Sequence, residues 1–206
     1  MRIITALVFS TLLSTLPGCT ETKKSSTHTA EKNDTHIIAQ KELNKPASSN
    51  KHIQDPQSFT LESTQKKTYR LSLLLNGNIE SKDSDNKIVI LNLAYLNDTL
   101  SLEQMKTVSK LQRKYPKQLR VVTLLLDETE KIATPTIFLN RHHIDHFVSL
   151  GKENQKIAKI LYKSLHLKKE TIPLCILYNK SEIYSYFEGI TPLEMLKSDI
   201  EQIIKK

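Results

Sequence analysis

Glycine, cysteine and long apolar runs are scarce in this chain of 206 residues, and each scarcity narrows the possible functions. With four glycines, the chain contains no glycine-rich loop that could hold a nucleotide phosphate. No apolar run reaches the about 20 residues that a helix needs to cross a bilayer. Only two cysteines, Cys19 and Cys175, could serve thiol chemistry.

Positive charge is abundant in the chain but is not concentrated. The formal net charge is +8, yet the lysines are scattered and no block of about five or six like charges occurs. This pattern favours a solvated surface, and we expect no nucleic-acid partner. A weak attraction to anionic lipid stays open.

The N-terminus has the pattern of an export signal that ends at a cysteine. Arg2 precedes an apolar run at residues 3–16, and Leu16-Pro17-Gly18-Cys19 follows. This segment resembles the lipobox of bacterial lipoproteins, in which the cysteine is lipidated. We therefore predict a lipoprotein signal peptide at residues 1–18 and lipidation of Cys19. A short transmembrane anchor or an ordinary cleaved secretory signal is the alternative.

Composition divides the remaining chain into a tether and one globular domain. Residues 19–58 are rich in Lys, Ser, Thr, Asn and His and have little apolar periodicity, which predicts a flexible polar tether. Residues 59–206 remain for a folded core. We expect this domain in the periplasm, held by lipid to the cell membrane or the outer membrane.

The domain has the alternation of an α/β fold. Residues 87–93 and 119–126 are nearly continuous apolar runs, typical of strands buried on both faces of a sheet. Between them, apolar residues at helical spacing predict an amphipathic helix at 99–115, which Pro116 ends. Two strands joined by such a helix form a βαβ unit with parallel strands.

The same alternation continues to the C-terminus. Apolar spacing, prolines and turn residues mark each further element. In order, we expect a helix at 135–143 capped by Thr134, a strand at 147–150, a helix at 152–165, a hairpin with strands 172–178 and 182–187, and a last helix that begins at Thr191-Pro192.

These elements resemble the TlpA-type proteins, membrane-tethered thioredoxin-like proteins of the bacterial periplasm in the thiol-disulfide oxidoreductase superfamily. The resemblance covers residues 59–206 and implies a thioredoxin-like fold, with a central mixed sheet flanked by helices. It is carried by Phe59-Thr60-Leu61 and Tyr69-Arg70-Leu71 as the N-terminal hairpin, 87–94 as the strand before the active site, 134–150 as the second helix and short strand, Glu170-Thr171-Ile172-Pro173 as the cis-proline loop, and 184–206 as the closing strand and helix.

The active-site cysteines of that family are missing. In redox-active members a Cys-x-x-Cys pair begins the helix after the first core strand, where the helix dipole lowers the pKa of the first thiol. At the family's spacing these positions fall on Asp98 and Ser101, which cannot form a disulfide. Asp98, and Ser101 with Gln104 in a capping box, could simply begin the helix. Alternatively, the two residues form a polar binding pocket that faces Pro173.

Cys175 stands two residues after Pro173, in a strand that we expect to be mostly buried. A lone buried cysteine behaves as a small inert hydrophobic residue unless nearby positive charge lowers its pKa. No such charge is evident in the local sequence. We interpret Cys175 as a packing residue, with a reactive thiol as the alternative.

His142, His143 and His146 have a spacing that could bring two imidazoles to one metal ion. Zinc and copper sites recruit three or four ligands, however, and no glutamate or cysteine accompanies these histidines. We interpret them as a basic helix end and turn. We expect no metal and no other cofactor.

The leading hypothesis is a lipid-anchored periplasmic thioredoxin-fold protein without dithiol chemistry. Its partners would be the membrane, through the lipidated N-terminus, and an envelope protein or extended peptide that binds beside Pro173 through strand-like contacts. The competing hypothesis is a thiol-disulfide oxidoreductase that uses Cys175 or a partner's thiol. A third is a structural lipoprotein of the envelope.

Overall fold

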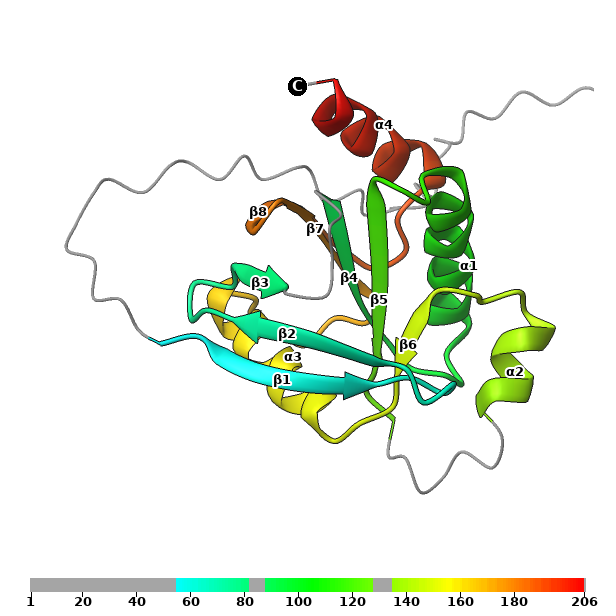
Figure 1. Cartoon of the computed structure of the whole chain (residues 1–206), viewed down its shortest axis with the longest axis horizontal. Helices are drawn as coiled ribbons and strands as arrows, with labels where there is room; N and C mark the ends of the chain where they lie inside the picture. Colours follow the sequence, from blue (N-terminus) through cyan, green and yellow to red (C-terminus); the bar gives the residue numbers. More distant parts are fainter. Residues whose placement is uncertain (1–54, 82–87, 128–134, 206) are drawn as a thin grey trace, which may run out of the picture. The chain divides into compact units, whose positions relative to one another are not determined.

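The computed structural model contains two sheets and four helices in the described part of the chain (Figure 1). The predicted signal peptide, Cys19 and nearly all of the predicted tether fall outside the described residues and stay predictions. Among the described residues, no helix is both long enough and apolar enough to span a bilayer. The structure describes residues 55–81, 88–127 and 135–205, all within the unit Ile37–Lys206.

The main sheet has five strands in the order β6-β5-β4-β7-β8. The β4–β5 and β5–β6 pairs are parallel, whereas β4–β7 and β7–β8 are antiparallel. The mixed sheet that the sequence predicts is therefore confirmed. The strands are β4 (Ile88–Ala94), β5 (Leu119–Leu125), β6 (Phe147–Ser149), β7 (Leu174–Asn179) and β8 (Glu182–Glu188).

All seven residues of β4 are buried, because a hydrophobic layer lies on each face of the sheet. Successive side chains of a strand point to opposite faces. Ile88 and Ile90 therefore enter one hydrophobic cluster, whereas Val89 and Leu91 enter the other. These two clusters explain why the sequence of β4 is a continuous apolar run rather than an alternating one.

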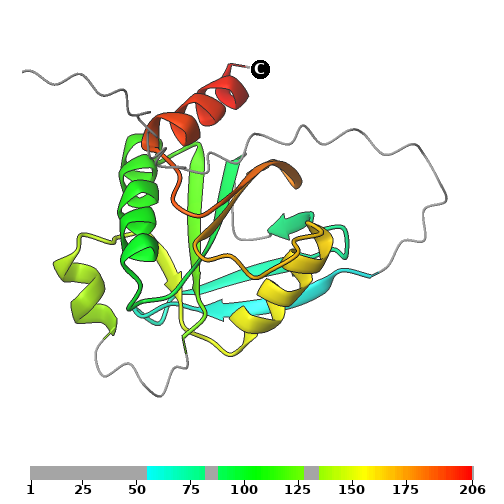
Figure 2. The same ribbon diagram turned by 180° about the vertical axis from the view of Figure 1, so that it is seen from behind.

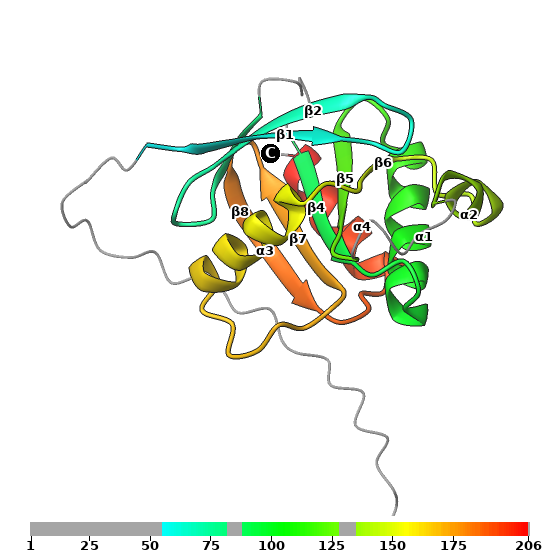
Figure 3. The same ribbon diagram turned by 90° about the horizontal axis from the view of Figure 1, so that it is seen from below.

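Helices cover both faces of the main sheet. α1 and α4 pack on one face, and α3 packs with the N-terminal strands on the other (Figure 3). α4 lies beside the C-terminal end of α1, where the Tyr115 hydroxyl donates a hydrogen bond to Glu201 at 2.7 Å (Figure 2). The helices are α1 (Thr99–Lys114), α2 (Pro135–Arg141), α3 (Glu153–Ser164) and α4 (Leu193–Ile204).

A second, antiparallel sheet contains β1 (Gln57–Glu62), β2 (Thr68–Leu73) and β3 (Ile79–Ser81). The predicted hairpin is confirmed, since Phe59 lies opposite Leu71 in the β1–β2 register. β1 begins at Gln57, slightly before the predicted start of the domain. β3 is not predicted, because a strand of three residues is too short to display alternation.

The turn between β2 and β3 is tied to the main sheet by a buried tyrosine. Gly77 has a φ of +84°, a conformation that costs glycine little and other residues much. The carbonyl of Gly77 accepts a hydrogen bond from the Tyr178 hydroxyl at 3.0 Å. Tyr178 is fully buried in β7, so this contact joins the two sheets inside the core.

Tyr178→Phe removes that contact while keeping the aromatic ring. We expect the free energy of unfolding to fall by about 1 to 2 kcal/mol, because the Gly77 carbonyl loses its buried partner. Chemical denaturation measures this change. Tyr184→Phe is the matched control, since the Tyr184 hydroxyl donates to Gln202 at an exposed site and its loss should cost far less. Equal losses of unfolding free energy in the two variants would contradict a stabilising role of the buried hydrogen bond between Tyr178 and Gly77.

Candidate functional site

Asp98 and Ser101, the two positions that the family resemblance predicts for the cysteines, both stabilise the start of α1. Asp98 is the N-cap, and its carboxylate accepts a hydrogen bond from the N–H of Ser101 at 2.7 Å. Ser101 is fully buried, and its hydroxyl accepts a hydrogen bond from the N–H of Tyr95 at 3.1 Å. A cap of this kind contributes about 1 kcal/mol. This geometry favours a helix-start role for the two residues over a polar binding pocket.

The capping box predicted between Ser101 and Gln104 is wrong. Ser101 is the third residue of α1, so it cannot be the N-cap. The Gln104 side-chain carbonyl instead accepts a hydrogen bond from the N–H of Thr191 at 2.7 Å, in a buried position. Gln104 thereby fastens α1 to the segment that enters α4, a contact between residues far apart in the sequence.

Pro173 lies in the loop before β7. The Ile172–Pro173 peptide bond is cis, the isomer that the family resemblance implies. Pro173 is buried, and its carbonyl accepts a hydrogen bond from the N–H of Gly189 at 2.8 Å. This hydrogen bond holds the residue after β8 against the cis-proline loop. Two residues further along the chain, Thr191 donates to Gln104 on α1.

Cys175 is enclosed in the core between the main sheet and α4. Its exposed fraction is 0%, and it lies opposite Asn92 in the β4–β7 register. Burial raises the pKa of the Cys175 thiol to about 12, although the neighbouring Gln104 side chain acts in the opposite direction. Near neutral pH the thiol is thus protonated and unexposed, which is the environment of an inert packing cysteine.

His146 takes part in a polar network that the sequence does not predict. Nδ1 shares a hydrogen bond with the Ser109 hydroxyl at 2.7 Å, and Nε2 shares one with the Thr123 hydroxyl at 2.8 Å. Thr123 also accepts a hydrogen bond from the Asn92 amide at 3.2 Å. Burial lowers the pKa of His146 to about 4, so the imidazole is neutral near neutral pH. Both ring nitrogens are engaged, and neither is free for a metal.

The other two histidines lie at the end of α2. The predicted helix end at His143 is wrong, because α2 stops at Arg141 and His143 adopts a φ of +55°. The N–H of Ile144 then bonds the carbonyl of Leu139 at 2.9 Å, and the N–H of His143 bonds that of Asn140 at 3.1 Å. These two bonds form a Schellman motif that ends the helix.

The three histidines therefore have separate roles: His143 ends α2, His146 joins the polar network, and His142 packs on a neighbouring ring. The His142 ring packs on Phe138 with ring centroids 4.5 Å apart. Among the described residues, no three His, Cys, Asp or Glu side chains are placed to hold one metal ion.

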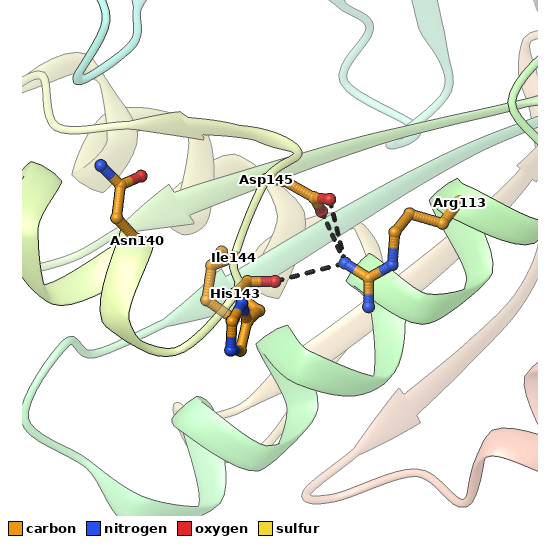
Figure 4. Close-up of a pocket in the computed structure, with 5 residues that line it drawn as sticks. All are labelled: Arg113, Asn140, His143, Ile144 and Asp145. Carbon is orange, nitrogen blue, oxygen red and sulfur yellow. Dashed lines mark hydrogen bonds and ion pairs between the residues drawn. The ribbon is translucent and has the colours of Figure 1, made fainter.

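An open depression of about 400 Å³ lies between α1 and the turn after α2 (Figure 4). Arg113 points across it to Asp145, and its guanidinium donates to the two carboxylate oxygens at 2.9 and 3.0 Å. The same guanidinium contacts the carbonyl of His143 at 3.3 Å. Because Arg113 is already paired, this depression does not offer an unpaired cation to an anionic ligand.

Comparison with known proteins identifies the fold. No family model matches the chain, and no curated protein matches it. Solved structures do match it. A protein of Chlorobium tepidum named as the thiol:disulfide interchange protein DsbE is 16% identical with a TM-score of 0.52, and the match covers 72% of this chain and 94% of that one.

Two further matches are similar in extent. A protein of Neisseria meningitidis named as a thioredoxin is 15% identical with a TM-score of 0.53, and the match covers 73% of this chain and 90% of that one. The C-terminal domain of a protein of Bacteroides thetaiotaomicron, named as a thiol-disulfide oxidoreductase, is 21% identical with a TM-score of 0.51 and covers 74% and 95%. The predicted thioredoxin-like α/β fold is thus confirmed, and identities this low speak to the fold alone.

The pKa of His146 leads to a prediction for stability against pH. The unfolded chain binds a proton on this residue near pH 6.5, whereas the folded chain binds it only near pH 4. Stability should therefore fall by about 2 to 3 kcal/mol as the pH drops from 6.5 to 4, since one pKa unit is about 1.4 kcal/mol. Denaturation across this range measures the loss. Because glutamine does not titrate, His146→Gln should reduce the dependence of stability on pH between pH 6.5 and pH 4. An unchanged dependence would show that His146 is not its cause.

The burial of Cys175 predicts that a maleimide modifies it only when the protein unfolds. The Cys19→Ser variant of the full chain makes Cys175 its sole thiol. We expect slow labelling of the folded protein near pH 7 and rapid, complete labelling in denaturant. Mass spectrometry over time measures both rates. Rapid labelling without denaturant would show that the thiol is accessible and reactive.

Proposed function

We propose that this protein is a thioredoxin-fold protein of the bacterial envelope that binds an extended peptide or protein segment and does not exchange disulfides. The observation that carries the proposal is the state of the thiol positions. Asp98 and Ser101, which stand where the family resemblance predicts cysteines, both form hydrogen bonds at the start of α1. Cys175, the only cysteine in the described part of the chain, is buried.

An exposed apolar surface beside Pro173 supports the binding role. We define the Pro173 surface as Tyr95, Leu100 and Ile190, whose exposed fractions are 39%, 49% and 48%. The N–H of Tyr95 donates to Ser101 in the first turn of α1. Ile190 lies between Gly189, whose N–H donates to the Pro173 carbonyl, and Thr191, whose N–H donates to the Gln104 side chain. The three side chains therefore come from segments that are held together. Exposed apolar groups that gather in this way are typical of protein-interaction sites.

An extended segment is the partner that this surface fits best. Such segments bind by main-chain hydrogen bonds and by side chains that enter apolar sites. The Pro173 surface offers apolar contacts beside the loop that leads into β7. Because its three members are apolar or aromatic, we expect segments with apolar side chains to bind.

The location of the protein is part of the same proposal. The N-terminal pattern that ends at Cys19 supports lipidation, and the polar composition of residues 19–58 supports a tether between the lipid and the domain. Lipid attachment would keep the domain in the periplasm at the cell membrane or the outer membrane.

A thiol-disulfide oxidoreductase is the second candidate, and the names of the matching structures favour it. That function would require Cys175 or a thiol from a partner protein. The burial of Cys175 and its raised pKa oppose the first route.

Binding of short unstructured peptides tests the proposal. Peptides selected from a random library on the wild-type protein should contain apolar side chains. The double substitution Leu100→Ser and Ile190→Ser should weaken their binding about ten-fold or more, because apolar contact area is lost. Fluorescence anisotropy with a labelled peptide measures the affinity.

Ile137→Ser is the matched control for this experiment. Ile137 is exposed to a similar degree, at 57%, but lies on α2 and outside the Pro173 surface. Its substitution should leave the affinity unchanged. If Ile137→Ser weakens binding as much as the double substitution does, or if the double substitution has no effect, the Pro173 surface is not the binding site.

A further inference from the structure

A small pocket lies against α3, on the face of the main sheet opposite to α1 and α4. Its volume is about 180 Å³. Sites for drug-sized ligands are about 300 to 1,000 Å³, so this pocket suits a molecule of only a few heavy atoms. Its lining includes Tyr95, Leu126 and Ala158.

A buried hydroxyl without a partner lines the pocket. Tyr162 is 7% exposed, and its hydroxyl has no hydrogen-bond partner among the described residues. Burial raises the pKa of Tyr162, and the nearby Glu170 carboxylate raises it further. The hydroxyl is thus protonated and close to a negative charge. Because an unpaired buried hydroxyl costs about 1 to 3 kcal/mol, a polar ligand group that reached it would be stabilised.

The pocket also carries one charge of each sign. Lys159 and Glu170 both line it, and neither forms an ion pair with another residue in the described ranges. A ligand that bears a single charge would be attracted by one of these two side chains and repelled by the other. A ligand that bears both charges would have a partner for each. Gln155 lines the same pocket, and its amide nitrogen donates to the Leu126 carbonyl at 3.4 Å, which leaves a second N–H on that nitrogen.

We propose that this pocket binds a free amino acid, or another zwitterion of that size. Its ammonium group would lie beside Glu170 and the Tyr162 hydroxyl, and its carboxylate beside Lys159 and the Gln155 amide. This inference goes beyond peptide binding: the pocket shares Tyr95 with the Pro173 surface, but Leu100 and Ile190, which test peptide binding, do not line it.

Calorimetric titration of the purified full-length protein tests the proposal with glycine, L-serine and both enantiomers of alanine. We expect saturable binding of at least one of the four. Two analogues of the amino acid that binds are then compared with it, one acetylated at nitrogen and one with an amide in place of the carboxylate. Each should bind about ten-fold more weakly or worse, because each lacks one charge. Failure of all four to bind, or equal binding of the analogues, would overturn the proposal.

Tyr162→Phe tests the role of the hydroxyl. The substitution should weaken binding about ten-fold, whereas Tyr184→Phe, which alters a hydroxyl bonded to Gln202, should not. Thermal unfolding of the variant without ligand distinguishes a role of the hydroxyl in ligand binding from a role in stability. Removal of an unpaired hydroxyl should leave the melting temperature unchanged or higher, and a clear fall would show that the hydroxyl already has a partner in the folded chain. That fall, or an unchanged affinity, would overturn the proposal.

Discussion

Burial of β4 on both faces is the constraint on which the rest of the described structure depends. A strand in this position must be covered by helices or strands on each side, and its polar groups must find partners inside the protein. The amide nitrogen of the buried Asn92 side chain finds such a partner, because it donates to Thr123 on β5. Thr123 in turn contacts His146, which contacts Ser109 on α1. One polar chain thus joins the strands to the helix that begins beside the Pro173 surface.

The same constraint determines the chemistry of Cys175. This residue lies opposite Asn92 on β7, so it faces the layer of α1 and α4 and is excluded from solvent. A thiol in that environment stays protonated near neutral pH and cannot meet a disulfide. The start of α1, where the family resemblance predicts reactive thiols, is occupied by a cap made from Asp98 and Ser101. The thioredoxin-like fold is therefore present, and Asp98 and Ser101, where the family resemblance predicts dithiol chemistry, stabilise a helix.

Local patterns in the sequence predict much of this fold. Apolar spacing predicts β4, β5 and α1 because each is long and is buried on a definite side. β3 escapes prediction because it is short. The end of α2 is not predicted, because His143 adopts the positive φ that glycine or asparagine usually adopts after a helix. His166, just after α3, has a φ of +53° in the same way, but the end of that helix is predicted within one residue.

The candidate sites were less predictable, because their contacts join distant segments. The helix-start residues Asp98 and Ser101 are neighbours in the sequence and could be found from it. Gln104 and Thr191, the partners of His146, and the pocket beside Tyr162 depend on how strands and helices pack. No local pattern contains that information.

Reduction of insulin by dithiothreitol, with and without the protein, tests the central claim most directly. If the protein lacks dithiol chemistry, insulin should precipitate at the rate set by dithiothreitol alone, and Cys175→Ser should behave as the wild type does. A rate clearly above that background, lost in Cys175→Ser, would contradict the claim and assign a redox function to the buried thiol.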